Sequence, residues 1–216
     1  RDKLVTGVQT CALPISVPSA PPVSITNGKS FNGDAAVDIN TAGTNAAVTI
    51  LHNSGSITGG GGTLGFHDGI QVRTSGSNAP ISVSTGQGTS VSATTSSGIK
   101  LRATGGAGIT VNADGSVTST YSALGVPLGY GIDARASGGN GSVIVNVTEN
   151  GSVSGTLGGI RGDAAGTGNV TITTAEGRTV TATSALLGTA IRGETVNGNV
   201  DIETGDGSIT SGGLAG

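Results

Sequence analysis

The feature that most constrains the fold of this chain is a repeat of about thirty residues. Five repeats open with a small residue, an isoleucine and a short alternating run: GIQV, GIKL, GIDA, GIRG and AIRG. Successive leading isoleucines are 29, 33, 28 and 31 residues apart. A fixed period of this length indicates a stack of similar structural units. The leading residues are Ile70, Ile99, Ile132, Ile160 and Ile191.

Each repeat contains two further alternating runs after the leading isoleucine. In the second repeat these are Ile109/Val111 and the run around Val117, and an earlier unit beginning near Val37 has the same order, which makes six units. Strict alternation predicts short strands with one buried face. A unit of this size buries that face only against its neighbours. The sequence therefore predicts an all-β, right-handed parallel β-helix of about six coils, with three strands per coil.

Composition agrees with this prediction and excludes other classes. Gly, Ser, Thr and Asn make up half of the chain, only four residues are aromatic, and Val and Ile far outnumber Leu. An antiparallel sandwich is the alternative all-β fold, but it does not explain why every third strand opens with the same residues. The formal net charge of −3 and the scattered Lys and Arg residues disfavour a nucleic-acid partner.

Three regions are expected along the chain. Residues 5–15 read VTGVQTCALPI and resemble the in-frame translation of a sequencing-library adapter. We therefore expect residues 1–16, including the only cysteine, Cys11, to be an adapter-derived artefact outside the natural protein. Residues 17–32, which are rich in proline, are expected to form an irregular lead-in. Residues 33–216 are expected to form the β-helix, as a fragment open at its C-terminal end.

Aligning the repeats by their leading isoleucines places charged residues in two columns on one outward face. One column lies one position after the isoleucine and the other lies three positions after it. In this register Lys100 is expected to pair with Asp133, Asp133 with Arg161, and Arg135 with Asp163. The two columns contain Gln71, Lys100, Asp133, Arg161 and Arg192, and Arg73, Arg102, Arg135, Asp163 and Glu194.

Arg161, Gly162 and Asp163 spell RGD, a tripeptide through which integrins recognise their ligands, and are candidate binding residues. The next unit has Arg192-Gly193-Glu194 in the same register, so drift within the repeat also explains the tripeptide. The longer connection from Ser119 to Gly131 is a second candidate binding feature, because Tyr121 and Tyr130 flank its loop.

The sequence predicts no catalytic, cofactor-binding or metal-binding residues. There is no G-x-S-x-G nucleophile motif. The only histidines are His52 and His67, and we interpret them as turn residues near a coil corner rather than as metal ligands. A carbohydrate-active β-helix enzyme would need several carboxylates that converge on one face.

The units GIRGDAAGTGNVTITTAEGRTVTATS and AIRGETVNGNVDIETGDGSIT resemble the passenger regions of bacterial autotransporters, the surface proteins of the type V secretion route. The resemblance covers roughly residues 33–216 and is one of repeat style. It implies a β-helix stalk at the bacterial cell surface or outside the cell, anchored by a C-terminal outer-membrane barrel that would lie in a missing part of the chain.

We therefore expect a non-catalytic stalk or adhesive segment that presents a repeated polar surface for adhesion or aggregation. Its expected partners are host or neighbouring-cell surface proteins or glycans, together with a second copy of the chain through open coil ends. A polysaccharide lyase or hydrolase, and a pure spacer for a binding head elsewhere, are the alternatives.

Overall fold

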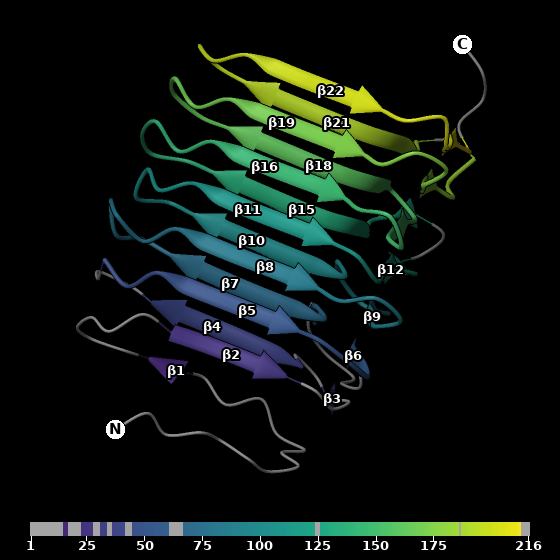
Figure 1. Cartoon of the computed structure of the whole chain (residues 1–216), viewed down its shortest axis with the longest axis horizontal. Helices are drawn as coiled ribbons and strands as arrows, with labels where there is room; N and C mark the ends of the chain where they lie inside the picture. The colour runs from purple at the N-terminus through teal and green to yellow at the C-terminus, as the bar shows by residue number, and fades with distance from the viewer. Residues whose placement is uncertain are drawn as a thin grey trace.

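The computed structural model describes residues 15–16, 23–27, 31–33, 36–41, 45–60, 67–123, 126–185 and 187–212. The chain winds through three parallel sheets, and each turn contributes one strand to each sheet (Figure 1). Within the described residues each of these sheets has seven strands. The predicted parallel β-helix is therefore confirmed.

The strands of each sheet follow one another at intervals of one coil. The first sheet contains β1 (Ile15–Ser16), β4 (Val37–Thr41), β7 (Ile70–Thr74), β10 (Ile99–Ala103), β15 (Tyr130–Ala136), β18 (Gly158–Ala164) and β21 (Thr189–Thr195). The second contains β2 (Val23–Asn27), β5 (Val48–His52), β8 (Ile81–Thr85), β11 (Ile109–Ala113), β16 (Val143–Val147), β19 (Val170–Thr174) and β22 (Val200–Thr204). The third contains β3 (Phe31–Gly33), β6 (Ser56–Gly59), β9 (Ser90–Ala93), β12 (Ser116–Ser119), β17 (Ser152–Gly155), β20 (Thr179–Ala182) and β23 (Ser208–Ser211).

The register along the first sheet follows the sequence repeat. Ile132 pairs with Ile99 on one side and with Ile160 on the other, and Ile160 pairs with Ile191. The leading isoleucines thus form one column, as the repeat predicts. Side chains alternate between buried and outward positions along most of these strands. The buried positions join into one continuous aliphatic core that runs through the stack.

The glycine before each leading isoleucine lies against the backbone of the neighbouring coil. A Cβ at Gly98 would be 2.8 Å from the carbonyl oxygen of Gly131, and one at Gly131 would be 2.9 Å from that of Gly159. Contacts this short exclude a side chain, so the spacing between coils requires glycine there. Ala190, which takes this position in the last repeat, has only the coil of Gly159 beside it in the described structure.

The N-terminal part of the chain differs from the expectation. Residues 17–32 were expected to be irregular, but β2 lies within them and pairs in register with β5. The strand β3 pairs with β6, and β1 pairs with β4. The strands β1, β2 and β3 therefore add a row to the stack beside β4, β5 and β6. Most of the supposed adapter segment lies outside the described residues.

The long connection between β12 and β15 interrupts the repeat. It contains a two-stranded antiparallel hairpin of β13 (Ser122–Ala123) and β14 (Val126–Pro127). The corresponding connection between β17 and β18 is only Thr156–Leu157. The end of this connection, after the hairpin, is bound to the next coil, because the Leu157 amide donates a hydrogen bond to the Gly129 carbonyl (2.9 Å). The Thr156 hydroxyl also accepts a hydrogen bond from the Gly129 amide (3.1 Å).

Replacing Ile132 by alanine tests the internal column. Ile132 is fully buried, and the substitution leaves a cavity between two coils, so we expect the free energy of unfolding to fall by about 2–5 kcal/mol. Ile144 lies in the same coil but is 37% exposed, and Ile144→Ala should change stability by only about 0.5 kcal/mol. Urea denaturation followed by circular dichroism measures both. Equal losses for the two variants would contradict the assignment of inward and outward positions.

Candidate functional site

The outward face of the first sheet carries the two predicted columns of charged residues. Lys100 pairs in register with Asp133, and Asp133 with Arg161. Arg102 pairs with Arg135, and Arg135 with Asp163. The columns are therefore confirmed as backbone neighbours. The ion pairs that the side chains form, however, differ in part from the expected ones.

Asp133 is the centre of this face. It is 3% exposed, although both columns were expected to point to solvent. One carboxylate oxygen accepts a hydrogen bond from Arg102 at 2.5 Å, and Arg135 donates to both oxygens at 2.8 and 3.0 Å. Burial acts to raise the pKa of Asp133, but the charges and hydrogen bonds of Arg102 and Arg135 outweigh it and lower the pKa below its usual value. Asp133 thereby lets two arginines lie side by side in adjacent strands.

Two of the expected ion pairs are replaced by others. Lys100 does not pair with Asp133, and its Nζ lies 3.7 Å from a carboxylate oxygen of Asp68. Arg161 does not pair with Asp133 either, because its guanidinium binds Asp163 on its own strand at 2.7 Å. Two planar guanidinium groups already occupy the Asp133 carboxylate, and arginine forms such two-pronged contacts better than lysine does. The expected pair of Arg135 with Asp163 is present, at 3.5 Å.

The RGD tripeptide lies within strand β18, between β15 and β21. Arg161 and Asp163 point outward and bind each other, with a hydrogen bond of 2.8 Å from Arg161 Nε. Gly162 is buried and points inward, where a Cβ would be 2.9 Å from the Val170 side chain. The motif is thus part of a paired strand, in the register that Arg192 and Glu194 repeat in the next coil.

Asp68 is a buried acid that was not among the predicted site residues. It is 1% exposed, and its carboxylate accepts a hydrogen bond from the Ser97 amide at 2.9 Å. Burial raises the pKa of Asp68, and the nearby Lys100 opposes this only in part. Asp68 differs from the other repeats in the sequence at its position two residues before Ile70. The equivalent positions of the next two repeats are Ser97 and Tyr130.

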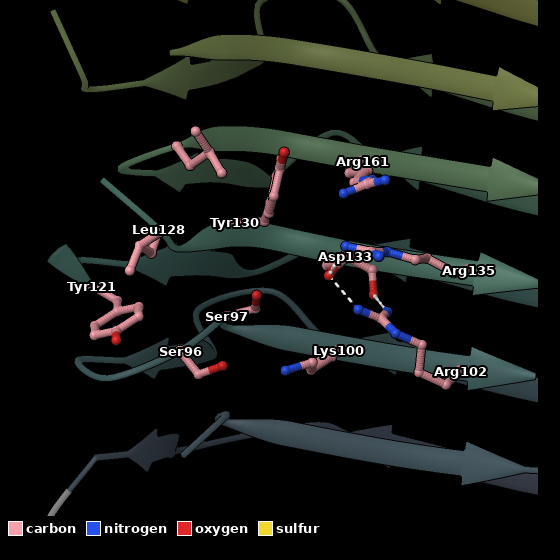
Figure 2. A pocket seen from close by; sticks show the side chains of 11 residues that line it. Ser96, Ser97, Lys100, Arg102, Tyr121, Leu128, Tyr130, Asp133, Arg135 and Arg161 are labelled. Carbon is pink, nitrogen blue, oxygen red and sulfur yellow. Dashed lines mark hydrogen bonds and ion pairs between the residues drawn. The ribbon is translucent and has the colours of Figure 1, made fainter. Parts of the chain in front are cut away.

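A hollow of about 360 Å³ opens beside Asp133, over the start of strands β10 and β15 (Figure 2). Tyr121 and Tyr130, the two predicted aromatic residues, both line it, and so does Arg161. The Tyr130 side chain packs under Arg161, whose guanidinium carbon lies 5.9 Å from the ring centroid. The structure therefore brings three of the five predicted binding residues to one place. Gly162 and Asp163 lie beside the hollow rather than in its lining.

The rest of the lining divides into an apolar and a polar part. Leu128 and Leu157 adjoin the tyrosines, and Leu128 follows the hairpin formed by β13 and β14. Figure 2 shows Tyr121 and Leu128 on one side and the arginines around Asp133 on the other. The polar part consists of Ser96, Ser97, Lys100, Arg102, Asp133, Arg135 and Arg161.

Both histidines were interpreted as turn residues near a coil corner, and this is wrong for His52, which ends strand β5. His52 is fully buried on the inner face of β5, and burial lowers its pKa. His67 is half-buried, and its amide donates a hydrogen bond to the Thr95 hydroxyl. Among the described residues no group of three or more His, Cys, Asp or Glu side chains is placed to hold a metal ion.

Comparisons with models of protein families, with curated proteins and with solved structures found no match for this chain. In the part of the chain that the structure describes, no helix has the length and apolar character needed to cross a membrane.

Replacing Asp133 by asparagine tests the charge arrangement. Its pKa is lowered on folding, so the ionised carboxylate stabilises the fold above the unfolded-state pKa, and this contribution is lost as pH falls through the folded-state pKa. We expect Asp133→Asn to lower the free energy of unfolding by about 1.5–3 kcal/mol at neutral pH. The difference from the parent protein should shrink in acid. Urea denaturation at several pH values measures it.

The exposed carboxylate Asp201 on β22 supplies the control. Asp201→Asn should change stability by less than about 0.5 kcal/mol at neutral pH. If Asp133→Asn is less stable than the parent protein by the same free energy of unfolding at neutral and at acid pH, the role given to the ionised carboxylate is contradicted.

Proposed function

We propose that this chain is a non-catalytic adhesive stalk segment of a secreted or surface-exposed, autotransporter-like bacterial protein. The observation that carries the proposal is the division between the inside and the outside of the solenoid. Aliphatic side chains fill the interior in register from coil to coil. The outward positions of the first sheet carry aligned charged side chains and the hollow. A stack of this kind presents an extended, repeated surface to a partner, as solenoid proteins do.

The lining of the hollow supports a binding role over hydrolysis. Glycosidases use a pair of carboxyl groups, one of which donates a proton. Asp133 lines the hollow, but two arginines hold its pKa low, which makes it a poor proton donor. Four cationic side chains surround it, and this favours an anionic ligand that is bound and released unchanged. The surface localisation and the anchoring barrel rest on the resemblance of the repeats.

Adhesion of beads coated with the purified chain tests the proposal. We expect coated beads to adhere to host epithelial cells or to immobilised glycans more than beads coated with an unrelated β-rich protein do. Arg161 and Asp163 bind each other within a paired strand, so an RGD peptide should not compete. Coated beads that bind neither cells, matrix proteins nor glycans would overturn the adhesive role and leave that of a spacer.

Self-association through a coil end belongs to the same proposal. In the last described coil the apolar side chains of Val200, Ile202 and Ile209 are 43%, 42% and 38% exposed. Among the described strands β22 is paired with β19 on one side only, and a strand edge of this kind can pair with another chain. We expect sedimentation velocity to show concentration-dependent dimers that Ile202→Lys weakens. A profile that is monomeric at every concentration would contradict this part of the proposal.

A further inference from the structure

The hollow beside Asp133 has an excess of positive charge. Lys100, Arg102, Arg135 and Arg161 line it against a single lining carboxylate. The acids that pair with these four cations are Asp68, Asp133, Asp163 and, at the edge, Glu194. Glu194 is 48% exposed and also pairs with Arg192, so it compensates the hollow weakly. Around the hollow itself, four cations and three acids leave one positive charge unmatched.

Three of the four cations are held by close contacts to carboxylates, and Lys100 is the least constrained. Arg102 and Arg135 are fixed by their hydrogen bonds to Asp133. Lys100 is different, since 3.7 Å separates it from Asp68, a distance longer than a hydrogen bond. Arg161, by contrast, is held by Asp163 on its own strand and lies over the Tyr130 ring. Lys100 is therefore the lining cation best placed to contact an anionic group.

The opposite side of the hollow has an apolar character. Tyr121 and Leu128 lie there, away from the arginines, as Figure 2 shows. Tyr121 is half-buried, so part of its side chain remains accessible. Ser96 and Ser97 lie between the two sides. The volume of about 360 Å³ is at the small end of the range for small-molecule sites, which leaves room for one or two sugar rings.

We propose that this hollow binds an acidic sugar, a pyranose ring that carries one carboxylate or sulfate group. The anionic group contacts Lys100, and an apolar ring face packs on Tyr121. The single unmatched charge favours a monoanion over a di- or triphosphate. This inference rests on the proposed adhesive function and names the chemical class of ligand for it.

Isothermal titration calorimetry with three disaccharides tests the proposal: one containing glucuronate, one carrying a sulfate ester, and cellobiose as the neutral probe. At low salt we expect at least one acidic disaccharide to bind about tenfold more tightly than cellobiose, because one charge-assisted hydrogen bond raises the affinity by about that factor. Raising the salt concentration should weaken this binding. The two acidic probes show which of the two anionic groups the site prefers.

Variants locate the binding. Lys100→Gln should lower the affinity for the acidic disaccharide about tenfold. Tyr121→Ala should lower this affinity by about three- to tenfold. The matched control is Arg73→Gln, which removes a cation from the same face on β7, outside the lining of the hollow, and should leave the affinity unchanged. Circular dichroism and the urea midpoint show whether each variant keeps the parent fold.

Several results would overturn the inference. These are equal affinity for the acidic and neutral disaccharides, unchanged binding in Lys100→Gln, or inorganic sulfate binding as tightly as the sulfated disaccharide. If beads coated with Lys100→Gln adhere to cells as well as beads coated with the parent protein, the adhesive function stands and this hollow has no part in it. Acidic sugars that bind in the hollow while coated beads fail to adhere would support the site and contradict the adhesive function.

Discussion

The rest of the structure depends on branched aliphatic side chains stacking in register from one coil to the next. A single coil of about thirty residues has too little interior to fold alone, so its strands are stable only when the neighbouring coils cover them. The column of Ile99, Ile132 and Ile160 is the clearest case, because these residues pair directly through the parallel strands. The glycine that precedes each of them sets the distance at which the coils can approach.

This constraint also determines what the outer surface can be. With alternate residues committed to the core, the outward residues of successive coils are brought into columns whether or not their charges suit one another. Arg102 and Arg135 are neighbours for that reason. The buried Asp133 turns an unfavourable juxtaposition into a favourable one, since its carboxylate binds both guanidinium groups. A charged residue in a solenoid is therefore best interpreted with the coils on either side of it.

The parts of the structure that follow from periodicity could be predicted from the sequence. The fold, the column of leading isoleucines and the backbone register of the charged residues all follow from the alignment of repeats. The ion pairs could not be predicted in the same way, because diagonal contacts and contacts along one strand compete with those directly across. Lys100 thus pairs with Asp68 instead of Asp133. The strand β2 was missed because nearby prolines obscured a short alternating run.

The candidate site lies where the repeat is broken. Strict repetition gives every coil a similar outer face, whereas the insertion before β15 adds a hairpin that brings Tyr121 and Leu128 beside strands β10 and β15. In the same place Tyr130 occupies a position that is serine in the preceding repeat and glycine in the following one. The regular coils thus supply a rigid, aligned set of charges, and one irregular connection turns part of that surface into a hollow. Specific recognition in a chain of this kind is best sought at such departures from the repeat.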